Sequence, residues 1–191
     1  MLSCKFFILR ASTNGDWGPS TIVGPNVTLP GSGHFMRTTT FLEYEFEQWN
    51  GDDLLEGEGC WVVSPKLARA ISDPAISGAA AQPLVVNFSL NALALSDSDE
   101  MKYLSCFKRL VPTGFSLYNS KLEVLDWNGE DISIGVLVDF VPNTSKLWRG
   151  PIESPYTLFV SQTVMDLLLD ETRFDIGGCS IDEVFLAEGD R

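Results

Sequence analysis

The sequence predicts an α+β fold, with a mixed, mostly antiparallel sheet covered by a few helices. Three observations lead to this class. Apolar and polar residues alternate over short stretches, as in half-buried strands, and most clearly from Leu42 to Phe46. Ser64-Pro65 is a clear helix start within a short strand–helix–strand pattern at 43–88. A similar pattern returns at 157–187, so we expect an internal strand–helix–strand repeat in a single domain spanning 1–191.

The N-terminal part is expected to form two strands separated by a long connection. The continuous apolar run inside Lys5 to Arg10 predicts the first strand. The segment 11–33 is rich in Gly, Pro, Ser, Thr and Asn, which predicts a connection that Trp17 pins to the body of the protein. In the second strand, Met36 to Phe46, apolar residues alternate with glutamates, so one face of this strand is expected to be acidic and solvated.

The first repeat unit continues with a short strand, a capped helix and a return strand. Asn50-Gly51 predicts a turn, and Cys60 to Val63 predicts the short strand. Ser64 is expected to cap the helix, because its side chain can accept a backbone N–H while proline fits the first helical position. The helix is expected to run through Ile71 and to stop before Pro74. A turn at 76–78 then leads to a strand at 83–88.

The middle of the chain gives weaker signals. We expect a linker at 91–98, with an acidic loop or helix start at 97–100, and either a helix or a strand at 101–111. Strands are expected at 121–127 and 134–141, joined by a hairpin turn at Asn128-Gly129, with an irregular loop at 142–155. The second unit then repeats the first, with Leu158 to Ser161 aligned on Trp61 to Ser64. The two units also align Ile76-Ser77-Gly78 on Ile176-Gly177-Gly178, and the strand 84–88 on 181–186.

The charge of the chain restricts its partners. The net charge is −13, from 26 acidic and 13 basic residues. Such a surface repels nucleic acid and anionic membranes and favours a basic partner, although acidity also simply aids solubility. No stretch reaches the ~18 apolar residues needed to cross a bilayer, and the N-terminus lacks the pattern of a signal peptide. We therefore expect a cytoplasmic protein that binds neither nucleic acid nor membrane.

No residue pattern predicts catalysis, a cofactor or a metal. Ser64 and Ser161 are interpreted as helix caps, and no nucleophile elbow is present. The four cysteines lack close pairs, so we expect free, mostly buried thiols; they are Cys4, Cys60, Cys106 and Cys179. The one histidine, His34, lies in a glycine-rich stretch. It leaves an alternative open, a small cytosolic enzyme that uses His34 with a nearby carboxylate.

The acidic residues gather in two stretches and form the candidate partner-binding surface. Carboxylates that face a basic active site accelerate association and fix orientation more than they add affinity. A solvated face without a partner is the simpler interpretation of the same residues. The candidates are Glu43, Glu45, Glu47, Asp52, Asp53, Glu56, Glu58, Asp97, Asp99 and Glu100.

The order of these signals resembles a family of bacterial immunity proteins from polymorphic toxin systems. That family has a strand leading to W-x-G-D-D-L, then a short strand ending in V-S that opens a helix, then a glycine turn and a P-V type strand. The corresponding residues here are Trp49, Gly51, Asp52, Asp53, Leu54, Val63, Ser64, Leu67, Ile71, Gly78, Pro83 and Leu84. The block from Leu158 to Gly178 is also similar to the C-terminal part of the family.

The resemblance implies a non-enzymatic immunity protein that binds and neutralises a cognate antibacterial toxin. It covers about half of the chain, and its motifs describe a fold rather than a reaction. The toxin implied is a secretion-system or contact-dependent effector with a basic active-site surface. An acidic scaffold or adaptor subunit is the alternative without catalysis.

Overall fold

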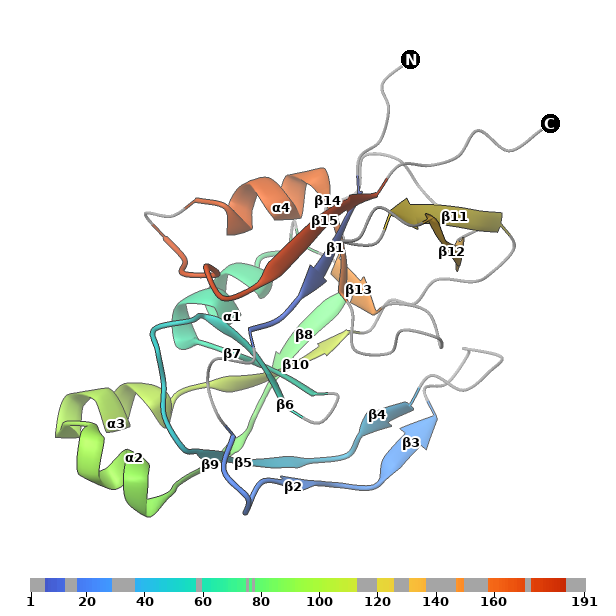
Figure 1. Ribbon diagram of the computed structural model, residues 1–191. Coiled ribbons are helices and arrows are strands. Elements are labelled where there is room, and N and C mark those ends of the chain that lie inside the picture. Colours follow the sequence, from blue (N-terminus) through green and yellow to red (C-terminus); the bar gives the residue numbers. More distant parts are fainter. Residues whose placement is uncertain are drawn as a thin grey trace.

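The computed structural model describes residues 6–12, 17–28, 37–57, 60–74, 76, 78–112, 120–125, 131–136, 147–149, 158–170 and 173–184. The α+β class is confirmed, because short helices cover mostly antiparallel sheets (Figure 1). The expectation of a single domain stays a prediction. Among the described residues, no helix is long and apolar enough to cross a membrane.

The central sheet is buried on both of its faces. Its strands, in spatial order, are β6 (Leu54–Gly57), β7 (Cys60–Val63), β10 (Lys108–Pro112) and β8 (Ala79–Gln82), and all neighbours are antiparallel. Side chains alternate along a strand, so Leu54 and Leu55 belong to different hydrophobic clusters, and so do Trp61 and Val62. The central sheet is therefore the middle layer between two cores.

A second four-stranded sheet, the terminal sheet, joins the two ends of the described chain. Its strands, in spatial order, are β13 (Leu147–Arg149), β14 (Leu158–Ser161), β1 (Phe6–Arg10) and β15 (Ser180–Val184). Strand β1 lies between β14 and β15 and is antiparallel to both (Figure 1). The first strand of the sequence is thus completed by strands more than 140 positions away.

The two four-stranded sheets have the same plan, which agrees with the expected repeat. In the central sheet, helix α1 (Pro65–Ile71) connects β7 to β8, and β10 lies between those strands. In the terminal sheet, helix α4 (Gln162–Leu168) connects β14 to β15, and β1 lies between them. The buried residues of α1 are Leu67, Ala68 and Ile71, and those of α4 are Val164, Met165 and Leu168. One alignment was wrong, because the strand equivalent to β15 is β8 rather than 84–88.

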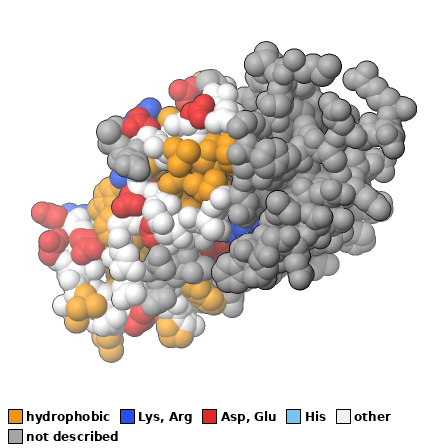
Figure 2. All heavy atoms as spheres, turned by 45° about the horizontal axis from the view of Figure 1, so that its top comes forward, with side chains coloured by type: hydrophobic (Ala, Val, Ile, Leu, Met, Phe, Trp, Pro, Cys, Tyr) orange, Lys and Arg blue, Asp and Glu red, His pale blue; other side chains and the backbone are white. Residues whose placement is uncertain are grey.

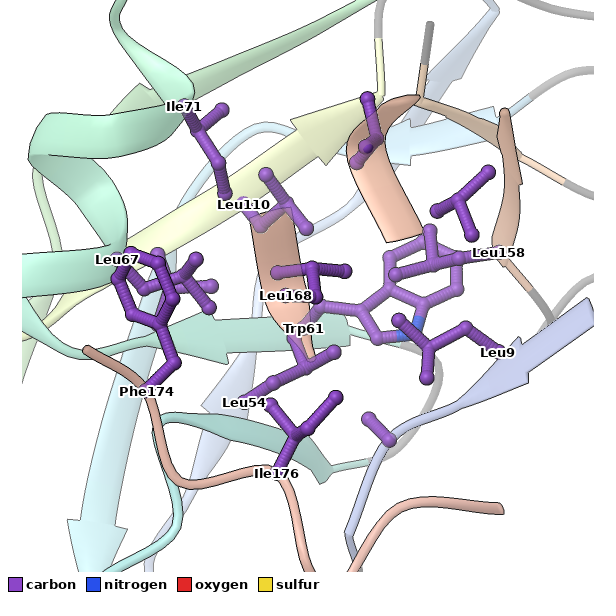
Figure 3. Close-up of a cluster of buried hydrophobic side chains, with 14 of the residues drawn as sticks. Leu9, Leu54, Trp61, Leu67, Ile71, Leu110, Leu158, Leu168, Phe174 and Ile176 are labelled. Carbon is purple, nitrogen blue, oxygen red and sulfur yellow. The ribbon is translucent and has the colours of Figure 1, made fainter. Parts of the chain in front are cut away.

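The first core lies where the central sheet, the terminal sheet and the helices α1 and α4 meet. Figure 3 shows Trp61 of β7 among Leu9, Leu158 and Leu168, with Leu67 and Phe174 farther away on the side of α1. The side chains of Leu9, Leu158 and Val160 are fully buried. Burial of apolar surface of this extent is the main favourable term in folding, so this core holds the two sheets together.

The second core lies on the other face of the central sheet. There a three-stranded sheet packs, with the order β2 (Ile22–Val23), β5 (Leu42–Phe46) and β9 (Val85–Phe88). Strand β5 buries Leu42, Tyr44 and Phe46 against Val62 and the helix α3 (Ser98–Leu104). Helix α2 (Leu90–Leu95) follows β9 and precedes α3, and both helices lie at one end of this sheet (Figure 1).

Two hairpins complete the described structure. Strands β3 (Asn26–Thr28) and β4 (Arg37–Thr39) pair antiparallel beyond the three-stranded sheet. Strands β11 (Ser120–Leu125) and β12 (Asp131–Val136) pair antiparallel, which agrees with the expected pairing of these two segments. The expected turn at Asn128-Gly129 lies outside the described residues.

Several elements differ from the expectations. Strands β6 and β8 were not predicted, and β2, β3 and β13 lie in segments expected to be irregular. Helix α2 occupies the expected linker at 91–98, and the ambiguous segment 101–111 contains both the end of α3 and most of β10. The sequence of β8, Ala79–Gln82, has little intrinsic strand preference, so its pairing with β10 decides its conformation.

Candidate protein-interaction surface

Three of the predicted partner-binding residues are buried, which corrects their assignment to an exposed surface. Asp53 is fully buried, Asp52 is 5% exposed and Glu45 is 9% exposed. Asp52 and Asp53 directly follow the turn expected at Asn50-Gly51 and were assigned to the acidic partner-binding surface. The structure instead uses their carboxylates to satisfy backbone N–H groups and hydroxyls within the protein, which compensates for their burial.

Asp52 and Asp53 fasten the loop before β15 to the segment before β6. One Asp52 oxygen accepts from the Gly178 backbone N–H at 3.0 Å, and the other accepts from the Ser12 hydroxyl at 2.7 Å. The Asp53 carboxylate accepts from the Asp175 backbone N–H at 2.6 Å, and the backbone N–H of Asp53 donates to the Asp175 carbonyl oxygen at 2.7 Å. These four bonds form the aspartate clamp, which joins the two repeat units.

The charge of Asp53 is balanced by Lys66 in the first turn of α1. The Lys66 ammonium lies 2.7 Å from the same Asp53 oxygen that Asp175 contacts, and the lysine side chain is 41% exposed. The other Asp53 oxygen is buried and has no hydrogen-bond partner among the described residues. An ion pair with one partner in solvent reduces the desolvation penalty of the buried carboxylate. The clamp is therefore structural.

Glu45 fastens the segment before β2 to strand β5. Its carboxylate accepts from the Ser20 backbone N–H at 2.9 Å, and its backbone carbonyl accepts from the Gly18 N–H at 2.7 Å. Its backbone N–H donates to the Thr21 hydroxyl at 3.0 Å. The long connection therefore covers part of the face of β5 that was expected to be solvated.

The predicted residues at α3 lie at the start of the helix, where carboxylates cap the helix and interact with its dipole. Asp97 is the N-cap and accepts from the backbone N–H groups of Glu100 and Asp99, both at 2.8 Å. These two bonds hold the pKa of Asp97 below its usual value. Asp99 pairs with Lys102 at 2.8 Å, and both side chains are exposed. The three carboxylates are stabilised by the positive end of the helix dipole and remain close to solvent.

The remaining predicted residues are partly accessible or outside the described part of the chain. Glu43 and Glu47 are half-buried on β5 and just after it. Glu56 is half-buried on β6, and this burial raises its pKa. Glu58 and the histidine of the alternative enzyme hypothesis, His34, lie outside the described residues.

The outer face of the three-stranded sheet carries apolar side chains around one of these carboxylates. The inner residues of β5 and β9 face the second core, so Glu43 and Val85 point the other way. The register places Glu43 directly between Ile22 and Val85 on the neighbouring strands. Ile22 is 50% exposed and Val85 is 55% exposed. Two residues before Glu43, Phe41 lies against Gly24 and is 45% exposed.

Helix α2 continues this apolar character beyond the end of β9. Ser89 caps it by accepting from the Ala92 backbone N–H at 3.1 Å, and Ala92 is its one buried residue. Leu90 is 87% exposed and Leu93 is 49% exposed. They lie at i and i+3, so they share the outward face of the helix. Asn91 donates to the backbone carbonyl of Glu47, which holds the start of α2 near the end of β5.

We define the apolar–acidic surface as the exposed and half-exposed residues of this sheet face and of the following helix α2: Ile22, Phe41, Glu43, Val85, Leu90 and Leu93. Among the described residues, nine large apolar side chains are exposed, and apart from Trp17, Leu169 and Ile181 all lie on or beside β5, β2, β9 and α2. Figure 2 shows small groups of apolar side chains along the lower edge of the molecule, acidic ones at its left side near α3, and a larger apolar group higher up. Apolar surface gathered in this way marks interaction sites more often than isolated exposed residues do.

Glu43 of this surface was predicted from the sequence, but the apolar residues of the surface were not. The available signal was the stretch Leu90–Leu95, in which leucines and alanines occur at helical spacing with one asparagine as the only polar residue. Most of this stretch fell within the segment 91–98, which was interpreted as a linker. The apolar residues of β2 and β9 could not be identified as exposed, because exposure depends on which face of the sheet is covered.

The described cysteines and Arg109 lie in different surroundings. Cys60 is buried, Cys106 is exposed, and burial raises the pKa of Cys179 to about 12. The Arg109 guanidinium is buried and donates to the Thr39 carbonyl at 2.7 Å and to the Gln82 side chain. In the part of the chain that the structure describes, no three His, Cys, Asp or Glu side chains are grouped to hold a metal ion.

Comparison of the chain with models of protein families, with characterised proteins and with solved structures gives no match. The function is therefore argued from the surfaces described above.

Proposed function

We propose that this protein is a non-enzymatic inhibitor that binds a toxic protein and neutralises it, as an immunity protein does. The observation that supports binding is the apolar–acidic surface, where leucine, isoleucine and valine side chains remain exposed beside carboxylates. Fully burying one such side chain contributes about 1.5–3 kcal/mol, so a partner that covers several gains substantial affinity. The choice of a toxin as partner comes from the resemblance to immunity proteins.

The charge of the protein supports a basic partner. Its net charge is −13, and the exposed carboxylates Asp97 and Asp99 lie on α3 near the apolar–acidic surface. A toxin that acts on nucleic acid has a basic active site, and such a site is attracted to this surface from a distance. The buried residues Glu45, Asp52 and Asp53 take no part in this proposal, because their carboxylates are used inside the fold.

A scaffold or adaptor that docks a basic protein is the second candidate, and the same surface favours it. The two functions differ in the consequence of binding, because an inhibitor abolishes the activity of its partner and an adaptor preserves it. The alternative enzyme that uses His34 has no support from the described residues and stays a hypothesis.

Co-expression tests the proposal directly. The protein is produced together with the toxin encoded beside its gene, and growth and complex formation are measured. We expect growth to be restored and a stable complex to be isolated at equimolar ratio. A complex that leaves the toxin active would favour the adaptor. Absence of both rescue and complex would count against the inhibitor.

A further inference from the structure

We propose that the apolar–acidic surface is the docking site, and that its occupant is a segment of another protein with an apolar stripe flanked by lysine or arginine. This inference takes from the proposed function only the idea that the protein binds a partner protein. It adds the place, the anchoring residues and the chemistry of the partner. Leu90 and Leu93 on α2 are the principal anchors, and Glu43 supplies the charge that selects a basic partner.

The exposure of α2 is the first argument. Leu90 is 87% exposed, whereas the smaller Ala92 is the residue that α2 buries. A short helix with its larger side chains in solvent and its alanine inside gains little from packing in the isolated protein. The helix is nevertheless fixed in place, because Ser89 caps it and Asn91 contacts the backbone of Glu47. The leucines are therefore presented on a support that needs no reorganisation on binding.

The distribution of charge is the second argument, and it identifies the class of partner. Strands β2, β5 and β9 and helix α2 contain no lysine or arginine. Their carboxylates include Glu43, which lies between Ile22 and Val85, and the carboxylates of α3 follow directly after α2. Lys102 is already paired with Asp99. An apolar centre with an acidic rim is complementary to an apolar centre with a basic rim.

The same charges disfavour the other occupants. A second copy of this chain would place Glu43 and the α3 carboxylates against an equally acidic surface, and like charges brought together are repulsive. An anionic lipid surface is repelled for the same reason. A cationic, amphipathic protein segment can bury the leucines and pair with the carboxylates. We therefore assign such a segment as the occupant of this surface.

The test uses three designed helical peptides of about 18 residues, a length at which a helix can form and span the surface. The first has leucines along one face and lysines on either side, the second has glutamates in place of the lysines, and the third has serines in place of the leucines. Each is labelled, and its binding to the full chain is measured by fluorescence anisotropy. Chemical-shift changes in the protein then locate the site.

We expect the leucine–lysine peptide to bind, with shift changes confined to β2, β5, β9, α2 and the start of α3. The leucine–glutamate peptide should not bind, and the serine–lysine peptide should bind at least about tenfold more weakly, since apolar anchors dominate affinity. The double variant Leu90→Ser/Leu93→Ser should weaken binding by about tenfold or more. Glu43→Gln should weaken it less and should reduce its dependence on salt.

Leu169→Ser is the matched control, because Leu169 is 50% exposed at the end of α4, away from these elements. This variant should bind the leucine–lysine peptide as the parent does. Circular dichroism checks that both serine variants remain folded. The proposal is overturned if the control and the double variant bind equally, if the shifts lie elsewhere, or if the serine–lysine peptide binds as tightly as the first. These outcomes do not depend on any toxin, so they are distinct from failure of the proposed inhibition.

Discussion

The carboxylate of Asp53 accepts a hydrogen bond of 2.6 Å from the backbone N–H of Asp175, which lies 122 residues further along the chain. The backbone N–H of Asp53 in turn donates to the Asp175 carbonyl oxygen. This reciprocal pair is the centre of the aspartate clamp and joins the two repeat units at the points where each enters a strand. The first two predictions concern this clamp.

Asp53→Asn should destabilise the protein strongly. The amide can still accept from Asp175, but it loses the ion pair with Lys66 and buries an N–H₂ group without a suitable acceptor. We expect a loss of about 2–4 kcal/mol in the free energy of unfolding, measured by urea titration. The control is Asp99→Asn, which removes an exposed ion pair with Lys102 and should cost no more than about 0.5 kcal/mol. Equal losses of unfolding free energy in the two variants would show that the buried clamp stabilises the protein no more than an exposed ion pair does.

Gly178→Ala should also destabilise the clamp, whereas Gly177→Ala should not. A Cβ at Gly178 would lie 2.6 Å from an Asp52 carboxylate oxygen and close to the Ser12 hydroxyl, which are held together by their own hydrogen bond. A Cβ at Gly177 would lie 3.4 Å from an exposed Asp175 oxygen, which can move. Overpacking of this kind costs about 1–3 kcal/mol. Thermal unfolding of the two variants gives the comparison, and a stable Gly178→Ala protein would contradict it.

Ser64→Ala should weaken α1 by removing its cap. The Ser64 hydroxyl accepts from the Leu67 backbone N–H at 3.2 Å and is fully buried, so its loss leaves that N–H without a partner. We expect a loss of about 1 kcal/mol, measured by urea titration. Ser72→Ala at the other end of the helix removes a hydroxyl that donates to the Ala68 carbonyl and should change stability by less than about 0.5 kcal/mol. A larger loss for Ser72→Ala would refute the assignment of the cap.

Cys179 should make the protein less stable at alkaline pH. The thiol has a pKa of 9.0 in its ordinary environment, and burial raises it to about 12 in the folded protein. Above pH 9 the unfolded chain therefore loses a proton that the folded protein keeps, and stability falls progressively until the folded pKa is reached. The expected contribution is a loss of about 1 kcal/mol between pH 7.5 and pH 10.

The measurement for Cys179 compares the parent with Cys179→Ala at both pH values. The substitution changes packing equally at each pH. The loss of unfolding free energy between pH 7.5 and pH 10 is therefore compared between parent and variant, and the difference is the contribution of the thiol. Lysine and tyrosine side chains also lose protons at alkaline pH. Their contributions are the same in the parent and the variant, so they cancel in this comparison. An identical pH dependence in parent and variant would exclude the assigned role of this thiol.

Much of the fold could be predicted from local signals. The cap at Ser64, the alternation in Leu42–Phe46 and the repeated strand–helix unit depend on neighbouring residues, and the structure contains all three. Ser161 occupies the N-cap position of α4 by its backbone, but its side chain does not cap the helix. The identity of a residue at a cap therefore predicts the helix boundary better than it predicts the hydrogen bond.

The acidic residues show why the site could not be predicted in the same way. Asp53 and Asp97 are both acidic residues directly before an element, Asp53 before β6 and Asp97 at the N-cap of α3. Asp53 is fully buried and bonded to the distant Asp175, whereas Asp97 is exposed and bonded to its neighbours Asp99 and Glu100. Sequence spacing carries no information on which distant segment returns to cover a side chain. The same limit explains why the exposed Val85 could not be distinguished from the half-buried Val86.

The position of β1 has a consequence for how the chain is made. Phe6 pairs with Ser161 on one side and with Val184 on the other, so a ribosome must translate residues as far as 184 before this strand has both neighbours. The central sheet, in contrast, uses only residues 54–112 and can assemble while synthesis continues. A nascent chain therefore carries β1 unpaired until β14 and β15 have been synthesised, and a copy terminated before β14 leaves that strand open to chaperones and proteases.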